Sequence, residues 1–209
     1  MEKICVVCDF DGTITERDTL YSFFEEYAVE EWKIVEELWV ENKISSKECL
    51  IKEFELVPNL SEKLIDKFLE SMTIDKDFKK FCSELKSKNI DIYIVSDGVD
   101  YFINKVLKKF NISEIDIISN HGEFVNGKFT LSFPNDNKNC PKDSGTCKCK
   151  VITTLKEKYE TVIYAGDGVS DFCSADKADI LYAKKRLLTY CKENGIKYIP
   201  YNTFKDIKI

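Results

Sequence analysis

The sequence lacks features that would point to a membrane, a secreted or a nucleic-acid-binding protein. No apolar run approaches the roughly 20 residues that a membrane-spanning helix needs, and the first run, at residues 4–8, is too short for a signal peptide. Positive charge is not in excess, because a net charge of −6 at pH 7 makes nucleic acid an unexpected partner. We therefore expect a soluble, cytoplasmic protein that binds neither membranes nor nucleic acid.

Cysteines are numerous, but their pattern does not fit a disulfide framework. The nine cysteines are an odd number and are scattered through apolar and helical patterns, so we expect mostly reduced thiols. Three of them, Cys140, Cys147 and Cys149, share one polar loop. A structural zinc ion needs four ligands, so the fold would have to bring Cys173 or His121 to complete a site. Zinc remains an alternative to thiols that simply pack in this loop.

The chain has enough apolar material for a substantial core. Its 209 residues are 44% hydrophobic and 12% aromatic, which argues against disorder and allows one large domain or a domain with an insertion. The run at residues 4–8 is short, β-branched and nearly free of polar residues, as a fully buried strand would be.

Two aspartates follow directly where this first strand should end, in the stretch Asp9-Phe10-Asp11-Gly12-Thr13. Residues two apart in extended chain point the same way, so the two carboxylates can face one small volume. Like charges so close together need a cation, a proton or a substrate between them. Gly12 allows a tight turn, and Thr13 offers a hydroxyl and an N–H group to an anion. The sequence therefore predicts a site for chemistry at this strand end.

Two further apolar runs end in the same manner. Residues 90–95 lead into Ser96-Asp97-Gly98, and residues 161–165 lead into Gly166-Asp167, with Asp171 four residues beyond. Ligands of open parallel α/β sheets bind beyond the carboxyl ends of the strands. We therefore expect the three strand ends to contribute to one site.

The order of strand and helix patterns predicts the architecture. Residues 16–73 contain four amphipathic helical patterns and no strand, as in a helical bundle. One crossover needs only one helix, so this segment is expected to be a cap inserted over the site. The alternating elements of residues 1–15 and 74–209 predict an α/β core with a three-layer, Rossmann-like parallel sheet. Residues 123–133 alternate around Asn126-Gly127, which predicts a small β-hairpin.

Taken together, these motifs resemble the haloacid dehalogenase superfamily of aspartate-nucleophile phosphatases. They are Asp9-x-Asp11-Gly12-Thr13, Ser96, a lysine before a helix, and Gly166-Asp167-x-x-x-Asp171. The chain is similar to the phosphoserine-phosphatase-like branch, and most to the methionine-salvage 2-hydroxy-3-keto-5-methylthiopentenyl-1-phosphate phosphatases. At Ser96-Asp97 and around Asp171-Phe172-Cys173 it is more similar to the phosphocholine and phosphoethanolamine phosphatases.

The resemblance implies Mg²⁺-dependent hydrolysis of a small phosphomonoester metabolite through an aspartyl-phosphate. Asp9 would be the nucleophile, since a carboxylate can attack phosphorus, and Asp11 would protonate the leaving group and later activate water. Asp9, Asp167 and the backbone carbonyl of Asp11 would hold Mg²⁺, and Asp171 would ligate it or a metal-bound water. With Asp11 in the proton-transfer role, His121 is expected to be a hydrogen-bonding loop residue.

Four residues are predicted to bind the substrate phosphate: Thr13, Ser96, Asp97 and Gly98. A lysine would neutralise the charge that develops there. Lys150 is the preferred candidate because it stands immediately before the helix expected at residues 151–159, and Lys148 is the second candidate.

Candidate specificity residues in the expected cap are Asp18, Tyr21 and Phe24, which lie nearest the catalytic turn. Asp18 stands where phosphoserine phosphatases place a substrate-reading glutamate, so phosphoserine is a weaker candidate substrate. Two other functions stay open. A phosphotransferase would pass the phosphoryl group to another acceptor, and a non-catalytic module would use the cysteine loop for metal or redox binding.

Overall fold

The computed structural model of the chain describes residues 3–140 and 143–209. Residues 1–2, in the expected core, and residues 141–142, in the expected polar loop, lie outside that description. Seven strands form one sheet in the order β4-β3-β2-β1-β5-β6-β7, in which only β4 runs antiparallel to its neighbour. The strands are β1 (Ile4–Cys8), β2 (Asp91–Val99), β3 (Asp116–Val125), β4 (Lys128–Ser132), β5 (Thr161–Gly166), β6 (Ile180–Ala183) and β7 (Ile199–Pro200).

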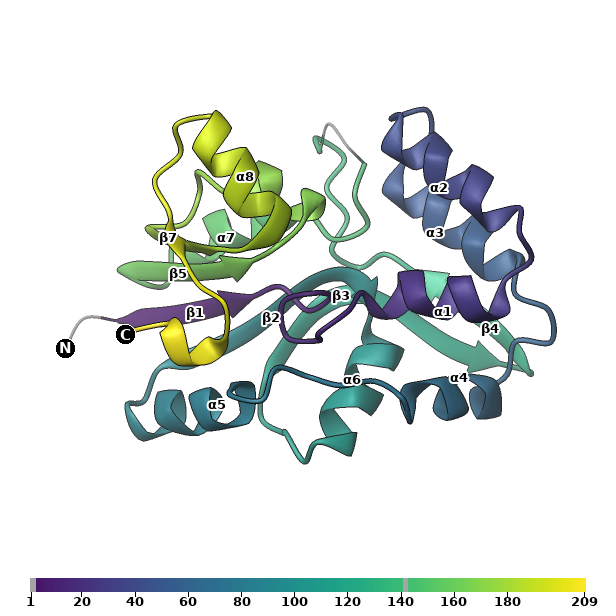
Figure 1. Cartoon of the computed structure of the whole chain (residues 1–209), viewed down its shortest axis with the longest axis horizontal. Coiled ribbons are helices and arrows are strands. Elements are labelled where there is room, and N and C mark those ends of the chain that lie inside the picture. The colour runs from purple at the N-terminus through teal and green to yellow at the C-terminus, as the bar shows by residue number, and fades with distance from the viewer. Residues whose placement is uncertain (1–2, 141–142) are drawn as a thin grey trace.

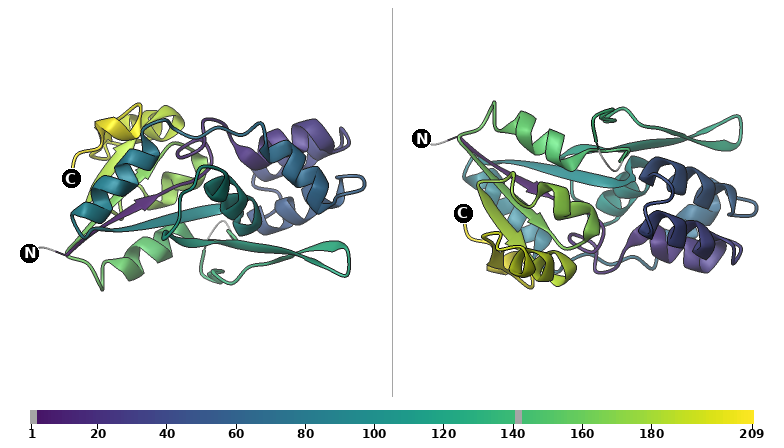
Figure 2. Two further views of the ribbon diagram at one scale, coloured as in Figure 1. Left: turned by 90° about the horizontal axis from the view of Figure 1, so that it is seen from below. Right: turned by 90° about the horizontal axis from the view of Figure 1, so that it is seen from above.

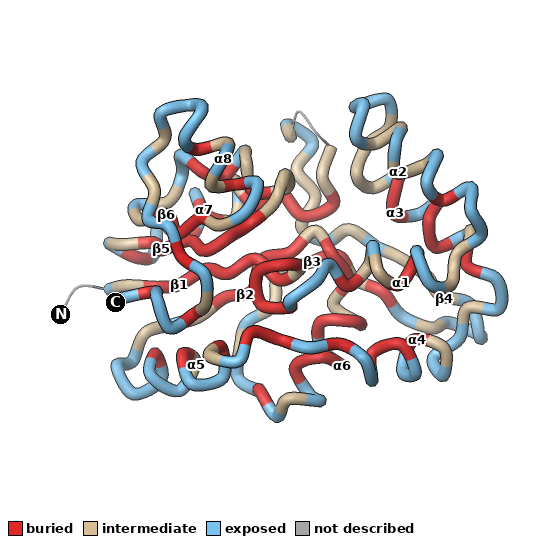
Figure 3. The backbone as a smooth tube through the Cα atoms, in the orientation of Figure 1, coloured by how far each residue is buried: buried red, intermediate tan, exposed pale blue. Residues whose placement is uncertain are grey.

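Helices cover both faces of this sheet (Figure 1). Val6 and Cys8 of β1 join the apolar cluster that α5 and α6 complete, whereas Cys5 and Val7 join the cluster of α7 and α8. Because β1 is buried on both faces, it is apolar throughout, and it lies in the buried centre of Figure 3. The predicted three-layer α/β fold is therefore confirmed. The helices are α5 (Phe78–Ser87), α6 (Asp100–Lys109), α7 (Lys148–Leu155) and α8 (Lys185–Glu193).

Four helices come between β1 and α5, and they lie together at the end of the molecule toward which β1 points (Figure 1). The chain leaves and re-enters the sheet region at one place, because Thr15 forms a β-bridge with Ile74. This arrangement agrees with an insertion at residues 16–73, and the division into core and cap stays a prediction. The four helices are α1 (Thr19–Tyr27), α2 (Trp32–Val40), α3 (Ser46–Glu55) and α4 (Glu62–Leu69).

Aromatic side chains join these helices to the rest of the protein. The ring centroid of Phe54, in α3, lies 5.9 Å from that of Phe102 in α6 and 4.9 Å from that of Phe129 in β4. Phe23 of α1 lies 5.2 Å from Phe102. All belong to, or pack against, the same apolar cluster as α5 and α6. The helices are thus packed against the core and are not held by chain connections alone.

The predicted hairpin is present, but it continues the main sheet. Strand β3 pairs with β2 through its first half and with β4 through its second half. Asn126 and Gly127 have φ values of 51° and 79°, the positive values that a tight two-residue hairpin turn requires. Figure 2 shows this hairpin extending alongside the helices of the expected cap. Within the described ranges, every helix is too short or too polar to cross a bilayer.

Replacing Phe54 with alanine should weaken the junction between α3, α6 and β4. Removing a buried phenyl ring typically lowers the free energy of unfolding by about 3–5 kcal/mol. The matched control is Ile34→Ala in α2, where the side chain is 59% exposed and a change within about 0.5 kcal/mol is expected. Chemical denaturation followed by circular dichroism measures both, and equal small losses would show that this junction carries little stability.

Candidate active site

The register of the sheet brings the three predicted strand ends together. Cys8, the last residue of β1, lies opposite Ile94 of β2 on one side and Ala165 of β5 on the other. The backbone N–H group of Asp9 donates to the carbonyl of Ala165 over 2.9 Å. Asp9 and Ser96 are both buried at this edge, with exposures of 4% and 1%. The acids and hydroxyls that follow each strand therefore share one site.

A buried lysine connects the acids of this site. Lys148 Nζ lies 2.6 Å from Asp9 Oδ1, 2.6 Å from Asp171 Oδ1 and 2.9 Å from Ser170 Oγ. Its side chain is only 1% exposed. Burial disfavours the charged ammonium, but the carboxylates of Asp171 and Asp9 outweigh it and raise the pKa of Lys148 above its usual value. Lys148 is thus the positive charge at the centre of the carboxylate cluster.

The preference for Lys150 as the lysine at this site is wrong. Helix α7 begins at Lys148, earlier than expected, so Lys148 points into the site from the first turn. Two helical residues later the side chain has rotated by about 200°. Lys150 is exposed, and its Nζ donates to the carbonyl of Asp136 at 3.4 Å.

Asp171 holds the loop that carries Asp167. Its Oδ1 accepts from Lys148 and from the hydroxyl of Tyr164, and its Oδ2 accepts from the N–H groups of Asp167 and Gly168 at 2.9 and 3.0 Å. The side chain is completely buried. Four donors occupy the two oxygens, so this carboxylate is arranged to fix its surroundings more than to receive a ligand.

Asp167 faces the turn after β1. Its Oδ1 accepts from Thr13 Oγ1 at 3.2 Å, and its Oδ2 accepts from Lys185 Nζ at 2.9 Å. A Cβ atom at Gly12, where φ is +75°, would lie 2.4 Å from Asp167 Oδ2, so only glycine fits this close approach. Lys185 was not predicted, because a lysine at the start of a helix far along the chain carries no distinguishing pattern.

Asp11 lies between the turn and the first helix of the expected cap. Its Oδ1 accepts from the N–H group of Thr19 at 2.8 Å. Burial, followed by the nearby Asp18 carboxylate, raises the pKa of Asp11 to about 7. A Cβ atom at Gly98 would lie 2.8 Å from Asp11 Oδ2 and 3.0 Å from Ser96 Oγ. Gly98 therefore lets the carboxylate and the serine hydroxyl approach the same space.

The carboxylate of Asp97 contacts other parts of the protein and is not suited to the predicted contact with phosphate. Its Oδ1 accepts from the N–H group of Thr146 at 3.0 Å, and its Oδ2 accepts from Ser46 Oγ at 3.4 Å. Burial raises the pKa of this carboxyl group. A carboxylate has no proton to donate to a phosphate, so the side chain instead ties helix α3 to the loop before α7.

The candidate specificity residues have three different environments. Asp18 caps α1, accepting from the N–H group of Tyr21 at 2.9 Å. Tyr21 is 45% exposed and packs edge-on against Trp32. Phe24 is 1% exposed and packs against the rings of Trp32 and Phe54, so its side chain contributes to the packing of the helices. Leu20, which was not predicted, is the apolar side chain near Gly98.

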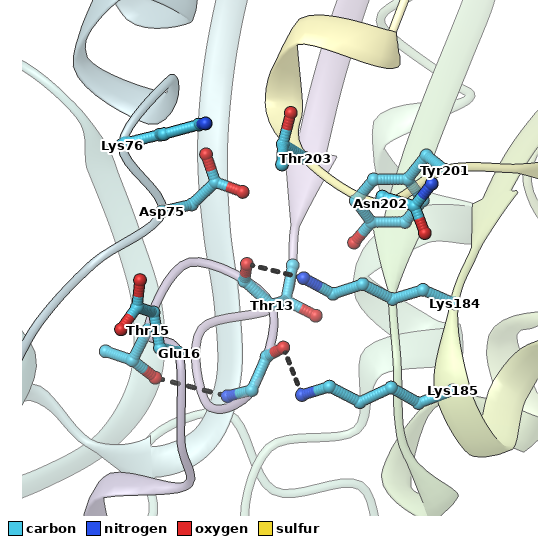
Figure 4. Close-up of a pocket in the computed structure, with 11 residues that line it drawn as sticks. Thr13, Thr15, Glu16, Asp75, Lys76, Lys184, Lys185, Tyr201, Asn202 and Thr203 are labelled. Carbon is cyan, nitrogen blue, oxygen red and sulfur yellow. Dashed lines mark hydrogen bonds between the residues drawn. The ribbon is translucent and has the colours of Figure 1, made fainter.

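A cavity of about 500 Å³ lies beside the turn after β1 (Figure 4). Two lysines extend into it from the start of α8: Lys184 Nζ donates to the carbonyl of Thr13 at 3.2 Å, and Lys185 Nζ to that of Gly12 at 2.8 Å. Asp75 lies across the cavity. The cavity adjoins the cluster through Lys185 and Thr13, which both bond Asp167, and Asp9 is not among its lining residues.

The carboxylates suit a divalent cation. One oxygen from each of Asp9, Asp167 and Asp171 lies within 4.8 Å of the others, and all three residues are buried. Burial, then the carboxylate of Asp171, raises the pKa of Asp9, although Lys148 opposes this. A cation here would favour the ionised form, and carboxylate and carbonyl oxygens are the ligands that Mg²⁺ prefers. Asp9 and Asp167 therefore fit such an ion, whereas the oxygens of Asp171 already accept from four donors.

The chain is similar to known proteins over nearly its full length. It is 33% identical over 208 residues to the 2-hydroxy-3-keto-5-methylthiopentenyl-1-phosphate phosphatase of Bacillus cereus (strain AH820), covering 99% of this chain and 94% of the relative. A solved HAD family hydrolase from Salmonella enterica subsp. enterica serovar Typhi is similar with a TM-score of 0.74 and 17% identity, covering 97% of this chain and 69% of that one.

A phosphoserine phosphatase, solved as a phospho-aspartyl intermediate analogue, has a TM-score of 0.71 and 20% identity, with 97% and 95% of the two chains covered. At these identities the solved structures show the shared fold alone. The family model described as "Putative Phosphatase" matches residues 4–187. Because that match spans most of the chain and a full-length relative is 33% identical, the chain belongs to this phosphatase family and is a phosphomonoester hydrolase.

Proposed function

We propose that the protein hydrolyses a small phosphomonoester metabolite through an aspartyl-phosphate on Asp9. The observation that carries the proposal is the position of Lys148, 2.6 Å from both Asp9 and Asp171 in a buried site at the strand ends. Asp9 Oδ1 accepts a hydrogen bond from Lys148. This bond orients the carboxylate for attack on phosphorus. The P–O bond to the leaving group breaks as the bond to Asp9 forms.

Asp11 is assigned the proton transfers of both half-reactions. Its Oδ2 lies near Gly98 and Ser96, so this oxygen faces the space that the transferring phosphoryl group would occupy. Protonated Asp11 gives its proton to the departing alkoxide, and the resulting carboxylate then takes a proton from the water that attacks the aspartyl-phosphate. Thr19 N–H holds the other oxygen and thereby fixes the orientation of the carboxyl group.

Several groups are positioned to stabilise the transferring phosphoryl group. Lys148 supplies positive charge and Ser96 supplies a hydroxyl donor, whereas the Thr13 hydroxyl donates to Asp167 and is assigned the positioning of that carboxylate. Asp97 is assigned a backbone N–H contact only, whereas the N–H group of Gly98 donates to Ser96 Oγ at 2.9 Å and so positions that hydroxyl. A Mg²⁺ ion held by Asp9, Asp167 and the backbone carbonyl of Asp11 would neutralise phosphate charge when bound. Asp171 is assigned the positioning of Lys148 and of the Asp167 loop.

The substrate we propose is 2-hydroxy-3-keto-5-methylthiopentenyl-1-phosphate or a close analogue. The support is the 33% identity, over nearly the full length of both chains, to a phosphatase named for that compound. Leu20, the apolar side chain near Gly98, suits the uncharged carbon chain of such an ester. Phosphate release to water, without an added acceptor, is the behaviour that distinguishes this function from phosphotransfer.

A panel of phosphate esters tests the proposed function. The purified chain with Mg²⁺ should release phosphate fastest from 2-hydroxy-3-keto-5-methylthiopentenyl-1-phosphate, and more slowly from phosphocholine, phosphoethanolamine, phosphoserine and an aryl phosphate.

Asp9→Asn, which is nearly isosteric, should abolish turnover and the acid-labile phosphoenzyme. Asp176→Asn, at an exposed position, is the matched control. A higher kcat/KM for phosphocholine than for 2-hydroxy-3-keto-5-methylthiopentenyl-1-phosphate would contradict the proposed substrate. An active Asp9→Asn variant would contradict the proposed mechanism.

Replacing Lys148 and Lys150 with methionine in two separate variants tests which lysine acts at the site. Lys148→Met should lower kcat by a factor on the order of 10²–10³, as loss of a transition-state donor does. Lys150→Met should leave kcat within about twofold, because its side chain is exposed and bonds only a backbone carbonyl. Steady-state kinetics measures both variants, and circular dichroism establishes that Lys148→Met remains folded. The reverse order of effects would overturn the assignment.

Removing divalent ions should stop turnover, and Mg²⁺ should restore it. Ca²⁺ should not substitute, because its longer bonds and higher coordination number disturb the in-line geometry. Asp167→Asn should raise the Mg²⁺ concentration for half-maximal rate by at least about tenfold, as losses of metal-site groups do. Asp176→Asn again serves as the control. Undiminished activity in excess chelator would remove the proposed metal from the reaction.

A further inference from the structure

Three cysteines from two separate segments meet beside the lysine of the active site. Cys147 and Cys149 flank Lys148 at the start of α7, and their sulfur atoms lie 3.2 Å apart. Cys173 belongs to the short helix η1 (Val169–Ser174), which also carries Ser170. Cys173 lies close enough to Cys149 for the thiol and the backbone N–H group of Cys149 to affect the pKa of the Cys173 thiol. The fold thus brings the fourth cysteine that the loop itself does not contain.

The remaining cysteine of the group, Cys140, belongs to the same neighbourhood. Burial, with contributions from Cys173 and Cys140, raises the pKa of the Cys149 thiol. The N–H group of Cys140 donates to the carbonyl of Asn137 at 2.8 Å, and the side-chain amide of Asn137 donates to Cys147 Sγ at 3.4 Å. Asn137 therefore links the turn that carries Cys140 to the sulfur of Cys147.

Nitrogen donors point at two of the sulfur atoms. The Asn137 amide reaches Cys147, and a backbone N–H group reaches Cys173. Such bonds favour a thiolate, which is the form that binds metal, and at Cys173 they oppose the burial that raises the pKa of this thiol. Cys149 contacts both Cys147 and Cys173, so the geometry does not select one partner for a disulfide. A shared ligand of all the sulfur atoms accounts for this arrangement better than one S–S bond.

We propose that Cys140, Cys147, Cys149 and Cys173 bind one Zn²⁺ ion in a structural site. Four thiolates are a typical closed donor set for Zn²⁺, with Zn–S bonds of about 2.3 Å. Among the described residues, no three of these sulfur atoms lie within 4.8 Å of one another, so binding of Zn²⁺ would draw the two segments together. Donor type separates this site from the carboxylate site, because soft thiolates select Zn²⁺ and hard oxygens select Mg²⁺.

The ion would join the two segments that hold the active-site lysine. Cys147 and Cys149 are the immediate neighbours of Lys148, and Cys173 lies three residues after Ser170, its hydrogen-bond partner. Zn²⁺ therefore fixes the start of α7 against η1. Zinc binding itself does not depend on the proposed phosphatase mechanism, and only its consequence for Lys148 does.

Metal content of the full chain tests the proposal. Protein purified without chelators should contain one zinc per chain by elemental analysis and by native mass spectrometry. Cys140→Ser and Cys173→Ser should each reduce zinc occupancy after dialysis by at least about tenfold. Cys82→Ser, in α5 and outside the cluster, is the matched control and should retain the ion. Asp167→Asn should also retain it, which separates this site from the carboxylates.

Cobalt substitution reports on the ligands without reference to activity. Co²⁺ bound by four thiolates should show intense tetrahedral d–d bands and a thiolate-to-metal charge-transfer band, both lost in Cys173→Ser. If a serine variant does not fold, modification of wild-type thiols should release zinc stoichiometrically to a chromogenic chelator. The proposal is overturned if the wild-type chain holds no zinc after reconstitution. It also fails if zinc persists in both serine variants, or if the intact mass shows a disulfide between these cysteines.

Discussion

The structure depends most on the buried contact of Lys148 with Asp9 and Asp171. Removing charged groups from water is costly, and their attraction compensates only where geometry is good and the remaining lone pairs are satisfied. Here Tyr164 and two backbone N–H groups satisfy Asp171, and Ser170 completes the bonds of the ammonium. The end of β1, the start of α7 and the segment after β5 must all be in place before this contact forms. The fold and the site are therefore formed by the same interactions.

The parts of the site that could be predicted from sequence are those defined by a single strand end. Asp9 follows β1, Ser96 lies near the end of β2, and Asp167 follows β5, so the change from apolar to polar residues marks each of them. The parallel register then places all three at one edge, as expected for a sheet buried on both faces. The α/β fold was predictable for the same reason, because β1 is apolar on both of its faces.

The parts that failed depend on helix boundaries and side-chain packing. Helix α7 begins at Lys148, so Lys148 enters the site and Lys150 does not. The residue pattern alone does not distinguish the two lysines. Phe24 is near the catalytic turn in sequence, yet the rings of Trp32 and Phe54 enclose it. Periodicity indicates that a residue faces an apolar surface, but it does not indicate whether that surface is a core or a binding site.

Charge balance explains how an acidic protein can accept an anionic substrate. The carboxylates of Asp9, Asp167 and Asp171 converge in one buried site, and the lysines in contact with them are Lys148 and Lys185. When all three carboxylates are ionised, their three negative charges against two positive ones leave an excess that would repel a phosphate dianion. A divalent cation reverses the sign of that excess and attracts the dianion, and its effect is strong because the surroundings are largely dry. The exposed charges that make up the net charge of −6 are separated from the site by solvent and salt, which screen their effect on a bound phosphate. Under the proposed function, local ion binding, and not the composition of the chain, would therefore decide whether phosphate can enter.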